Sequence, residues 1–156
     1  MEKNKHEQHI TRQLRILFKT VQLHAKKVEK ACGLSSAKIW MLHEISANSG
    51  LKVSELAGAL SIHPSTCSNM LDKLEDMQLI ARDRSRSDQR SVHLSLTEKG
   101  QNLLVQAPIP HQGELNTALA KLSETQLLNL ETGLDDLLQA LKIEDSDAAM
   151  VPIVGE

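Results

Sequence analysis

The residues of this chain best suited to binding an anion lie in a short segment near its middle. Four arginines fall within nine residues: Arg82, Arg84, Arg86 and Arg90. Guanidinium groups pair with phosphate oxygens through two parallel hydrogen bonds, so a loop that carries several of them is suited to gripping a nucleic-acid backbone. The alternative is a solvated loop without a partner, because runs of charge are commonly exposed to solvent.

Metal chemistry is a second interpretation that the residue types raise. Folding could gather five side chains that ligate metals, although none forms a tight pair in the sequence: His24, Cys32, His43, Glu44 and His111. His43 and Glu44 are adjacent, and adjacent residues on a helix point in different directions. We therefore predict no metal site and keep a metal-responsive protein as an alternative.

Redox chemistry is a third interpretation. Cys32 and Cys67 lack the spacing of a metal site or a disulfide framework, so we expect free thiols. Cys67 lies near the expected start of a helix, where the helix dipole would lower the pKa of its thiol and favour oxidation. A buried core cysteine is the simpler interpretation, and a redox-responsive protein is the alternative.

Catalysis has no recognisable basis in the sequence. The chain contains no glycine-rich phosphate loop, no nucleophile elbow and no close carboxylate pair in an apolar setting. We therefore expect a protein that binds a partner and not an enzyme, with no catalytic residue and no cofactor.

Length and composition indicate a soluble globular protein. The 156 residues suffice for one domain, or for one domain with a dimerising extension. No apolar run approaches the length of a membrane span, and the polar first eight residues lack the apolar region of a signal peptide. We expect a cytoplasmic location and no membrane partner.

The net charge of −2 hides a strong asymmetry between the two ends of the chain. Residues 1–30 carry eight Lys or Arg against three Asp or Glu, whereas residues 121–156 carry two against eight. Because the local field attracts phosphate, a negative net charge does not exclude a nucleic-acid partner.

Apolar periodicity and capping residues predict two helices before residue 51. Apolar residues recur at helical spacing from about residue 7 to residue 31, and Gly33 is a suitable stop. Ser35 is suited to cap a second helix that ends near residues 48–50.

A helix-turn-helix is predicted next. A short helix over residues 53–60 is followed by the connection 61–63 and by a helix from Pro64 to about Met77. Short polar side chains near the start of this second helix are of the type that reads base edges in DNA. An ordinary surface helix is the alternative interpretation.

A hairpin and two further helices complete the predicted fold. Strands 79–84 and 90–96 flank the loop 85–89, and Thr97 caps a fifth helix that is interrupted at residues 108–110. Ser123 and Gln126 form a capping box at the start of a sixth helix, which reaches about residue 143.

These elements predict a mainly α fold, an α+β winged helix-turn-helix of six helices and a two- or three-stranded β wing. We expect residues 35–96 to form the DNA-binding module and residues 144–156 to form a flexible acidic tail. The helices in residues 1–34 and 97–143 carry more apolar surface than the small DNA-binding module can cover. We therefore expect residues 1–34 and 97–143 to form a helical dimerisation layer. An intramolecular helical bundle is the alternative.

Several motifs resemble the MarR family of winged-helix transcriptional regulators. They are Ser54-Glu55-Leu56-Ala57, the helix of residues 65–75, Asp88-Gln89-Arg90, and Leu94-Ser95-Leu96-Thr97-Glu98-Lys99-Gly100. The resemblance covers about residues 10–142. It implies a homodimer that binds pseudo-palindromic double-stranded DNA operators, usually as a repressor. Members of the family are often released by small aromatic ligands or by oxidation, and a few are governed by metal.

The resemblance assigns roles to individual residues of this chain. It makes residues 64–77 the recognition helix in the major groove and the loop 85–89 the tip of the wing in the minor groove. The candidate DNA contacts are Ser65, Thr66, Ser68, Asn69 and Lys73 on the helix, and Arg84, Arg86, Ser87, Gln89 and Arg90 on the wing. Asp88 matches the acidic residue that holds the wing arginines in place.

This chain departs from the family pattern at three positions. Asn69 and Lys73 stand where arginine is common, and Gln78 replaces a glycine that often ends the recognition helix. These departures bear on the sequence preference and the affinity for DNA. If the backbone at Gln78 is left-handed, it stores strain of about 1 kcal/mol.

A small-molecule site and a rival function complete the expectations. His24 and Trp40 are the candidates to line the cleft where ligands of the family bind, although a hydrogen-bonded core histidine is the simpler interpretation of His24. A winged-helix adaptor that binds a protein partner through the same surface is the alternative function, and the wing arginines favour DNA.

Overall fold

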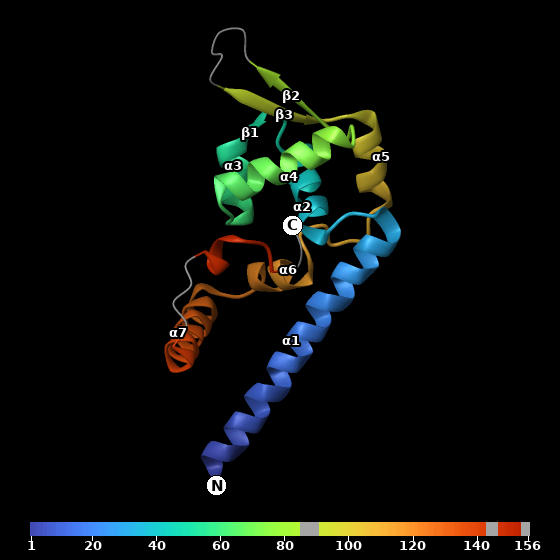
Figure 1. The fold of residues 1–156 in the computed structure, drawn as a ribbon. Helices are drawn as coiled ribbons and strands as arrows, with labels where there is room; N and C mark the ends of the chain where they lie inside the picture. The colour runs from blue at the N-terminus through green and yellow to red at the C-terminus, as the bar shows by residue number, and fades with distance from the viewer. Residues whose placement is uncertain (85–90, 143–146, 154–156) are drawn as a thin grey trace.

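The computed structural model describes residues 1–84, 91–142 and 147–153 and forms a mainly helical winged-helix fold (Figure 1). Within these residues the helices are α1 (Glu2–Cys32), α2 (Ser36–Ala47), α3 (Val53–Leu60), α4 (Pro64–Asp76), α5 (Glu98–Gln106), α6 (Glu114–Ala120), α7 (Glu124–Leu141) and the 3-10 helix η1 (Ala148–Met150). The strands are β1 (Leu51–Lys52), β2 (Ile80–Arg84) and β3 (Val92–Leu96). The predicted fold class is confirmed.

The predicted capping residues begin and end the helices as expected. Ser35 Oγ accepts a hydrogen bond from the backbone N–H of Lys38 at 3.3 Å, and Ser123 forms a complete capping box with Gln126. Gly33 ends α1 in a left-handed conformation with φ of 69°. These bonds satisfy backbone groups that a helix end otherwise leaves unpaired.

The core lies between the helix-turn-helix and the sheet. Ile39, Leu42 and Ile45 of α2 are at most 2% exposed, as are Leu56 of α3 and Leu71 of α4. Burial of each such side chain stabilises the fold by about 1.5–3 kcal/mol. The winged module is therefore the well-packed part of the chain.

The sheet has three strands, the larger of the two predicted numbers, whereas the helix count differs from the prediction. β1 adds a third strand, and the order in the sheet is β1-β3-β2 with Leu51 opposite Leu94. The predicted fifth helix is two helices in the structure, α5 and α6, because Pro108 and Pro110 in the connection cannot donate backbone hydrogen bonds. The described part of the chain thus holds seven α-helices where six were expected.

Part of the C-terminal segment lies in contact with the winged module. Residues 147–153 include η1, and the carbonyl of Met150 accepts a hydrogen bond from the backbone N–H of His63 at 2.9 Å. The predicted tail residues 144–146 and 154–156 lie outside the described residues.

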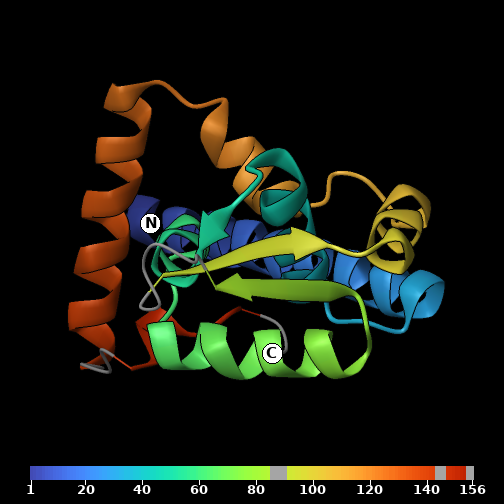
Figure 2. The same cartoon turned by 90° about the horizontal axis from the view of Figure 1, so that it is seen from above.

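The long terminal helices leave much apolar surface uncovered. α1 buries only His24 and Val28, and α7 buries no residue. Seen from above, α7 stands at one edge of the molecule, away from the sheet (Figure 2). The leucines of its apolar stripe are 39–55% exposed: Leu127, Leu130, Leu134, Leu137, Leu138 and Leu141.

A tight junction joins the end of α4, the base of the wing and the start of α5. The backbone N–H of Thr97 donates to the carbonyl of Leu79 at 3.1 Å, and Thr97 Oγ1 donates to the carbonyl of Gln78 at 2.6 Å. Gln78 is left-handed, with φ of 61°, so the strain anticipated there is present. Gly100 is buried against Leu79, and a Cβ atom at Gly100 would overlap the Leu79 carbonyl.

We expect Gly100→Ala to lower the free energy of unfolding by roughly 1–3 kcal/mol, because the added methyl must displace backbone. Urea denaturation would measure the loss. Gly58→Ala is the matched control, since a Cβ there meets nothing within 4 Å. On the exposed α3 position the control should leave stability equal or raise it by about 0.5–1 kcal/mol. Equal effects of the two substitutions would contradict the junction.

Candidate nucleic-acid interface

α4 presents one apolar face to the core and one polar face to solvent. Cys67, Met70, Leu71 and Leu74 are buried. Three of the predicted contact residues, Ser65, Asn69 and Lys73, are exposed and recur every four residues, which aligns them along one face of the helix. Thr66 and Ser68 are half-buried beside this row.

The turn before α4 fixes the angle of the helix-turn-helix. Ser61 is left-handed, with φ of 53°, and the backbone N–H of Ile62 donates to the carbonyl of Ala57 at 3.0 Å. The side chain of Ile62 is buried, so the turn is held by the core as well as by hydrogen bonds. Pro64 occupies the first turn of α4 as predicted.

Arg82 links the wing to α4, and the sequence analysis gave it no individual role. Its Nη2 donates to Asp72 Oδ1 at 2.8 Å and to the Ser68 carbonyl at 3.4 Å, and its Nε lies 3.6 Å from Glu75 Oε2. Arg82 is 24% exposed, whereas the two carboxylates are about half exposed. β2 runs alongside α4 in Figure 2, and this arginine spans the two.

The ion pairs of Arg82 change the electrostatics of the polar face. α4 carries three carboxylates, Asp72, Glu75 and Asp76, which repel phosphate. Arg82 offsets the charge of the first two. The pairing could have been suspected from Asp72 and Glu75, which stand three residues apart on one helix face, but only folding brings Arg82 opposite them.

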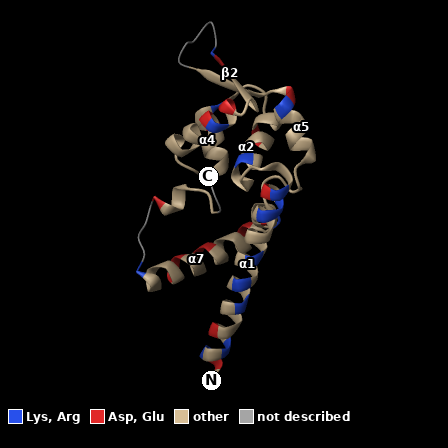
Figure 3. Ribbon diagram, turned by 45° about the vertical axis from the view of Figure 1, so that its right-hand side comes forward, with Lys and Arg blue, Asp and Glu red and all other residues tan. Residues whose placement is uncertain are grey.

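The remaining predicted wing residues are only partly described. Arg84 is exposed at the end of β2, where the hairpin projects away from the helices (Figures 1 and 3). Arg86, Ser87, Asp88, Gln89 and Arg90 lie outside the described residues.

Cys67 is a buried core cysteine, which confirms the simpler of the two interpretations of this residue. Burial raises the pKa of Cys67 to about 11, and the positive charge of Arg82 only partly opposes that shift. Burial raises the pKa of Cys32 as well. Since the thiolate is the nucleophile, both cysteines are poorly suited to rapid oxidation.

Folding brings together two of the candidate metal ligands that form no pair in the sequence. His43 Nδ1 and His111 Nδ1 lie 3.0 Å apart, and Gln112 Nε2 lies 3.4 Å from His43 Nε2. Burial, and then the neighbouring His43, lower the pKa of His111. Glu44 is engaged elsewhere, as acceptor for Trp40 Nε1 at 3.1 Å. Within the described residues no three His, Cys, Asp or Glu side chains gather as a metal site would require.

His24 and Trp40 line the same cavity, of about 270 Å³. Its walls come from α1, α2, the turn after α3, the start of α6 and residues 149–153. His24 is 8% exposed, and its Nε2 has no hydrogen-bond partner among the described residues. Trp40 is half-buried. A buried imidazole nitrogen without a partner is costly, and a bound polar group would satisfy it.

Comparison with known proteins agrees with this architecture. Residues 34–92 match the sequence profile of the MarR family. The transcriptional repressor MprA of Escherichia coli is 30% identical over 127 residues, which cover 80% of this chain and 72% of MprA. The chain belongs to the MarR family. The repressor MdtR of Bacillus subtilis is 28% identical over 132 residues, which cover 85% of this chain and 85% of MdtR.

A solved relative extends the agreement to the whole MarR fold. The MepR–DNA complex of Staphylococcus aureus superposes with a TM-score of 0.58 and 25% identity, covering 85% of this chain and 96% of that one. The profile match begins in the loop before α2 and ends at the first residue of β3, so it covers most of the winged module and excludes α1 and α5–α7. None of the helices in the described residues is long and apolar enough to span a membrane.

A double-mutant cycle tests the link between the wing and α4. We expect Arg82→Ala and Asp72→Ala to show a coupling free energy of about 0.5–1 kcal/mol, the range for a partly exposed, charge-assisted pair. The same cycle with Arg84→Ala in place of Arg82→Ala is the control and should give no coupling. Urea denaturation at low salt provides the measurement. Equal coupling in both cycles would show that Arg82 has no special role.

Proposed function

We propose that this chain is a homodimeric, ligand-responsive transcriptional repressor that binds a pseudo-palindromic DNA operator. The observation that carries the proposal is the exposed polar row on α4, held at a fixed angle by the helix-turn-helix and by Arg82 of the wing. The repressor names of MprA and MdtR, and the DNA-bound MepR structure, support the same function.

α4 enters the major groove in this proposal. Asn69 has the amide donor and acceptor that match an adenine edge, whereas Lys73 supplies a point charge for a phosphate. Ser65 and Thr66, near the start of the helix, and Ser68, one turn further on, complete the proposed surface with short hydroxyls.

The wing supplies the minor-groove contacts. We assign these to Arg84, Arg86, Ser87, Gln89 and Arg90, with Asp88 holding the arginines, on the strength of the family resemblance and the local charge. The chain lacks arginine at positions 69 and 73, so the wing carries a large share of the affinity.

Dimerisation covers the apolar surface of the terminal helices. The leucines of α7 are exposed, as are Ile10, Leu17 and Phe18 of α1. α7 carries four acidic residues and no basic one, whereas α1 is rich in lysine and arginine (Figure 3). Burial of these stripes between two copies would present two α4 helices to half-sites about 34–36 Å apart.

The cavity is the proposed ligand site. It is small enough for an aromatic molecule of modest size, with an apolar body against Trp40 and a polar group at His24. Such a ligand would supply the partner that His24 Nε2 lacks.

Substitutions on α4 separate base reading from phosphate binding. With operator fragments selected from the source genome, fluorescence anisotropy should show that Asn69→Ala changes the preferred bases. Lys73→Ala should weaken binding to all fragments by the same factor. It should also lower the slope of log affinity against log salt by about one. Lys121→Ala on the exposed end of α6 is the charge-matched control. An unchanged base preference in Asn69→Ala would refute the orientation of α4.

Sedimentation velocity tests the dimer. Leu134→Glu places a charge in the α7 stripe and should convert the dimer into a monomer at micromolar concentration, because an unpaired charge is costly at an apolar interface. Ala59→Glu is the matched control, since Ala59 on α3 is exposed and lies in the winged module, outside the expected dimerisation layer. A wild-type monomer, or equal dissociation in the two variants, would defeat the proposal.

A further inference from the structure

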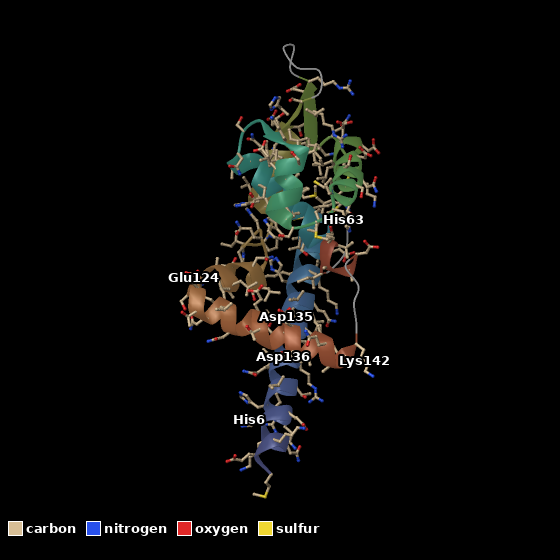
Figure 4. All side chains as sticks on the ribbon, turned by 90° about the vertical axis from the view of Figure 1, so that its left-hand side faces the viewer. His6, His63, Glu124, Asp135, Asp136 and Lys142 are labelled. Atoms are coloured by element: carbon tan, nitrogen blue, oxygen red, sulfur yellow. The ribbon has the colours of Figure 1, made fainter. Side chains whose placement is uncertain are left out.

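The C-terminal segment, residues 147–153, lies between the cavity and the start of α4. Ala149, Val151, Pro152 and Ile153 line the cavity, as do residues of α1. Figure 4 shows His63 beside this segment, at the point where α4 begins. One short stretch of chain therefore touches both the proposed ligand site and the proposed recognition helix.

Two polar contacts join the segment to His63, the N-cap residue of α4. The backbone N–H of His63 donates to the Met150 carbonyl at 2.9 Å, and His63 Nε2 lies 3.4 Å from Asp147 Oδ1. The His63 side chain itself makes no capping hydrogen bond to α4. The position of this residue thus depends in part on a segment more than eighty residues away in the sequence.

The segment is held weakly enough to be displaced. Asp147 is 90% exposed, and exposed ion pairs contribute little to stability. Val151 and Ile153 line the cavity but remain 38% and 71% exposed, while Met150 and Pro152 are half-buried. Segments with so little buried apolar surface open at low cost in free energy.

We propose that residues 147–153 are a lid over the cavity, that a ligand entering the cavity displaces them, and that the displacement is transmitted to α4 through His63. This inference rests on the proposed ligand-responsive function. With the lid in place, Met150 and Asp147 hold the start of α4. With the lid displaced, both contacts are lost and α4 is no longer fixed in its DNA-binding position.

The lid and the ligand compete for one wall of the cavity. The apparent affinity for a ligand equals the intrinsic affinity multiplied by the fraction of molecules in which the lid is open. A variant whose lid is released should therefore bind ligand more tightly and DNA more weakly than the wild type. These opposite shifts distinguish a lid from a segment that only stabilises the fold.

The experiment uses Trp40, the chain's single tryptophan, as a reporter in the cavity wall. The probe is 8-anilinonaphthalene-1-sulfonate, an aromatic anion whose binding is followed by energy transfer from Trp40. Pro152→Glu in the full chain should release the lid and tighten probe binding at least fivefold. A chain that ends at Lys142 is a second variant with the same expected result. Gln101→Glu adds an equal charge at an exposed position of α5 that does not line this cavity, and it should match the wild type.

Hydrogen exchange gives an independent readout at His63. Its amide should lose protection in Pro152→Glu and in wild type saturated with the probe, because both remove the Met150 acceptor. Affinity for a selected operator fragment should fall severalfold in the same two cases.

Unchanged probe affinity in both lid variants would overturn the proposal. So would a His63 amide that stays protected when the probe saturates the wild type. If no variant binds any DNA fragment while probe affinity and His63 exchange change as expected, the lid stands and the proposed DNA-binding function fails.

Discussion

At Leu79 the end of the recognition helix, the base of the wing and the start of α5 come within hydrogen-bonding distance of one another. The carbonyl of Leu79 accepts from Thr97, and Gly100 packs so closely against it that no side chain fits. Lys99 Nζ adds a hydrogen bond to the Met77 carbonyl at 2.9 Å. The geometry of the DNA-binding surface depends on this contact, because it sets both the wing and α5 relative to α4.

Arg82 forms a second link between the wing and α4, through its ion pairs with Asp72 and Glu75. It ties β2 to α4 and offsets the charge of two carboxylates on the helix that is proposed to bind DNA. This resolves the apparent conflict between a negative net charge and a nucleic-acid partner. Acidic residues on α4 are paired with an arginine of the wing, and much of the remaining negative charge is carried by α7 and the C-terminal segment.

The cavity connects the proposed dimer layer to the winged module. α1 and α6 form one side of it, and α2 with the turn after α3 forms the other, so a molecule bound there touches both parts. His24 contributes a buried nitrogen without a partner, and residues 149–153 contribute a weakly held wall. The proposed ligand site therefore combines the buried nitrogen of His24 with the proposed lid beside α4.

Much of the fold could be predicted from the sequence because its signals are local. The caps at Ser35, Thr97 and Ser123 join residues three positions apart, and Gly33 ends its own helix. The bounds of α3 and α4 follow from the apolar period and from Pro64. The motifs around the wing also predicted the MarR family.

The sequence by itself determined the helices, the helix-turn-helix and the polar row on α4, because those depend on neighbours within a few residues. The tertiary structure decided which distant groups meet. It paired β1 with β3, Arg82 with Asp72, and His43 with His111, which lie 68 residues apart. It also set the pKa of the Cys67 thiol, because burial raises that pKa more than the nearby positive charge of Arg82 lowers it. Contacts and burial of this kind are set by packing of the whole chain, and no local pattern specifies them.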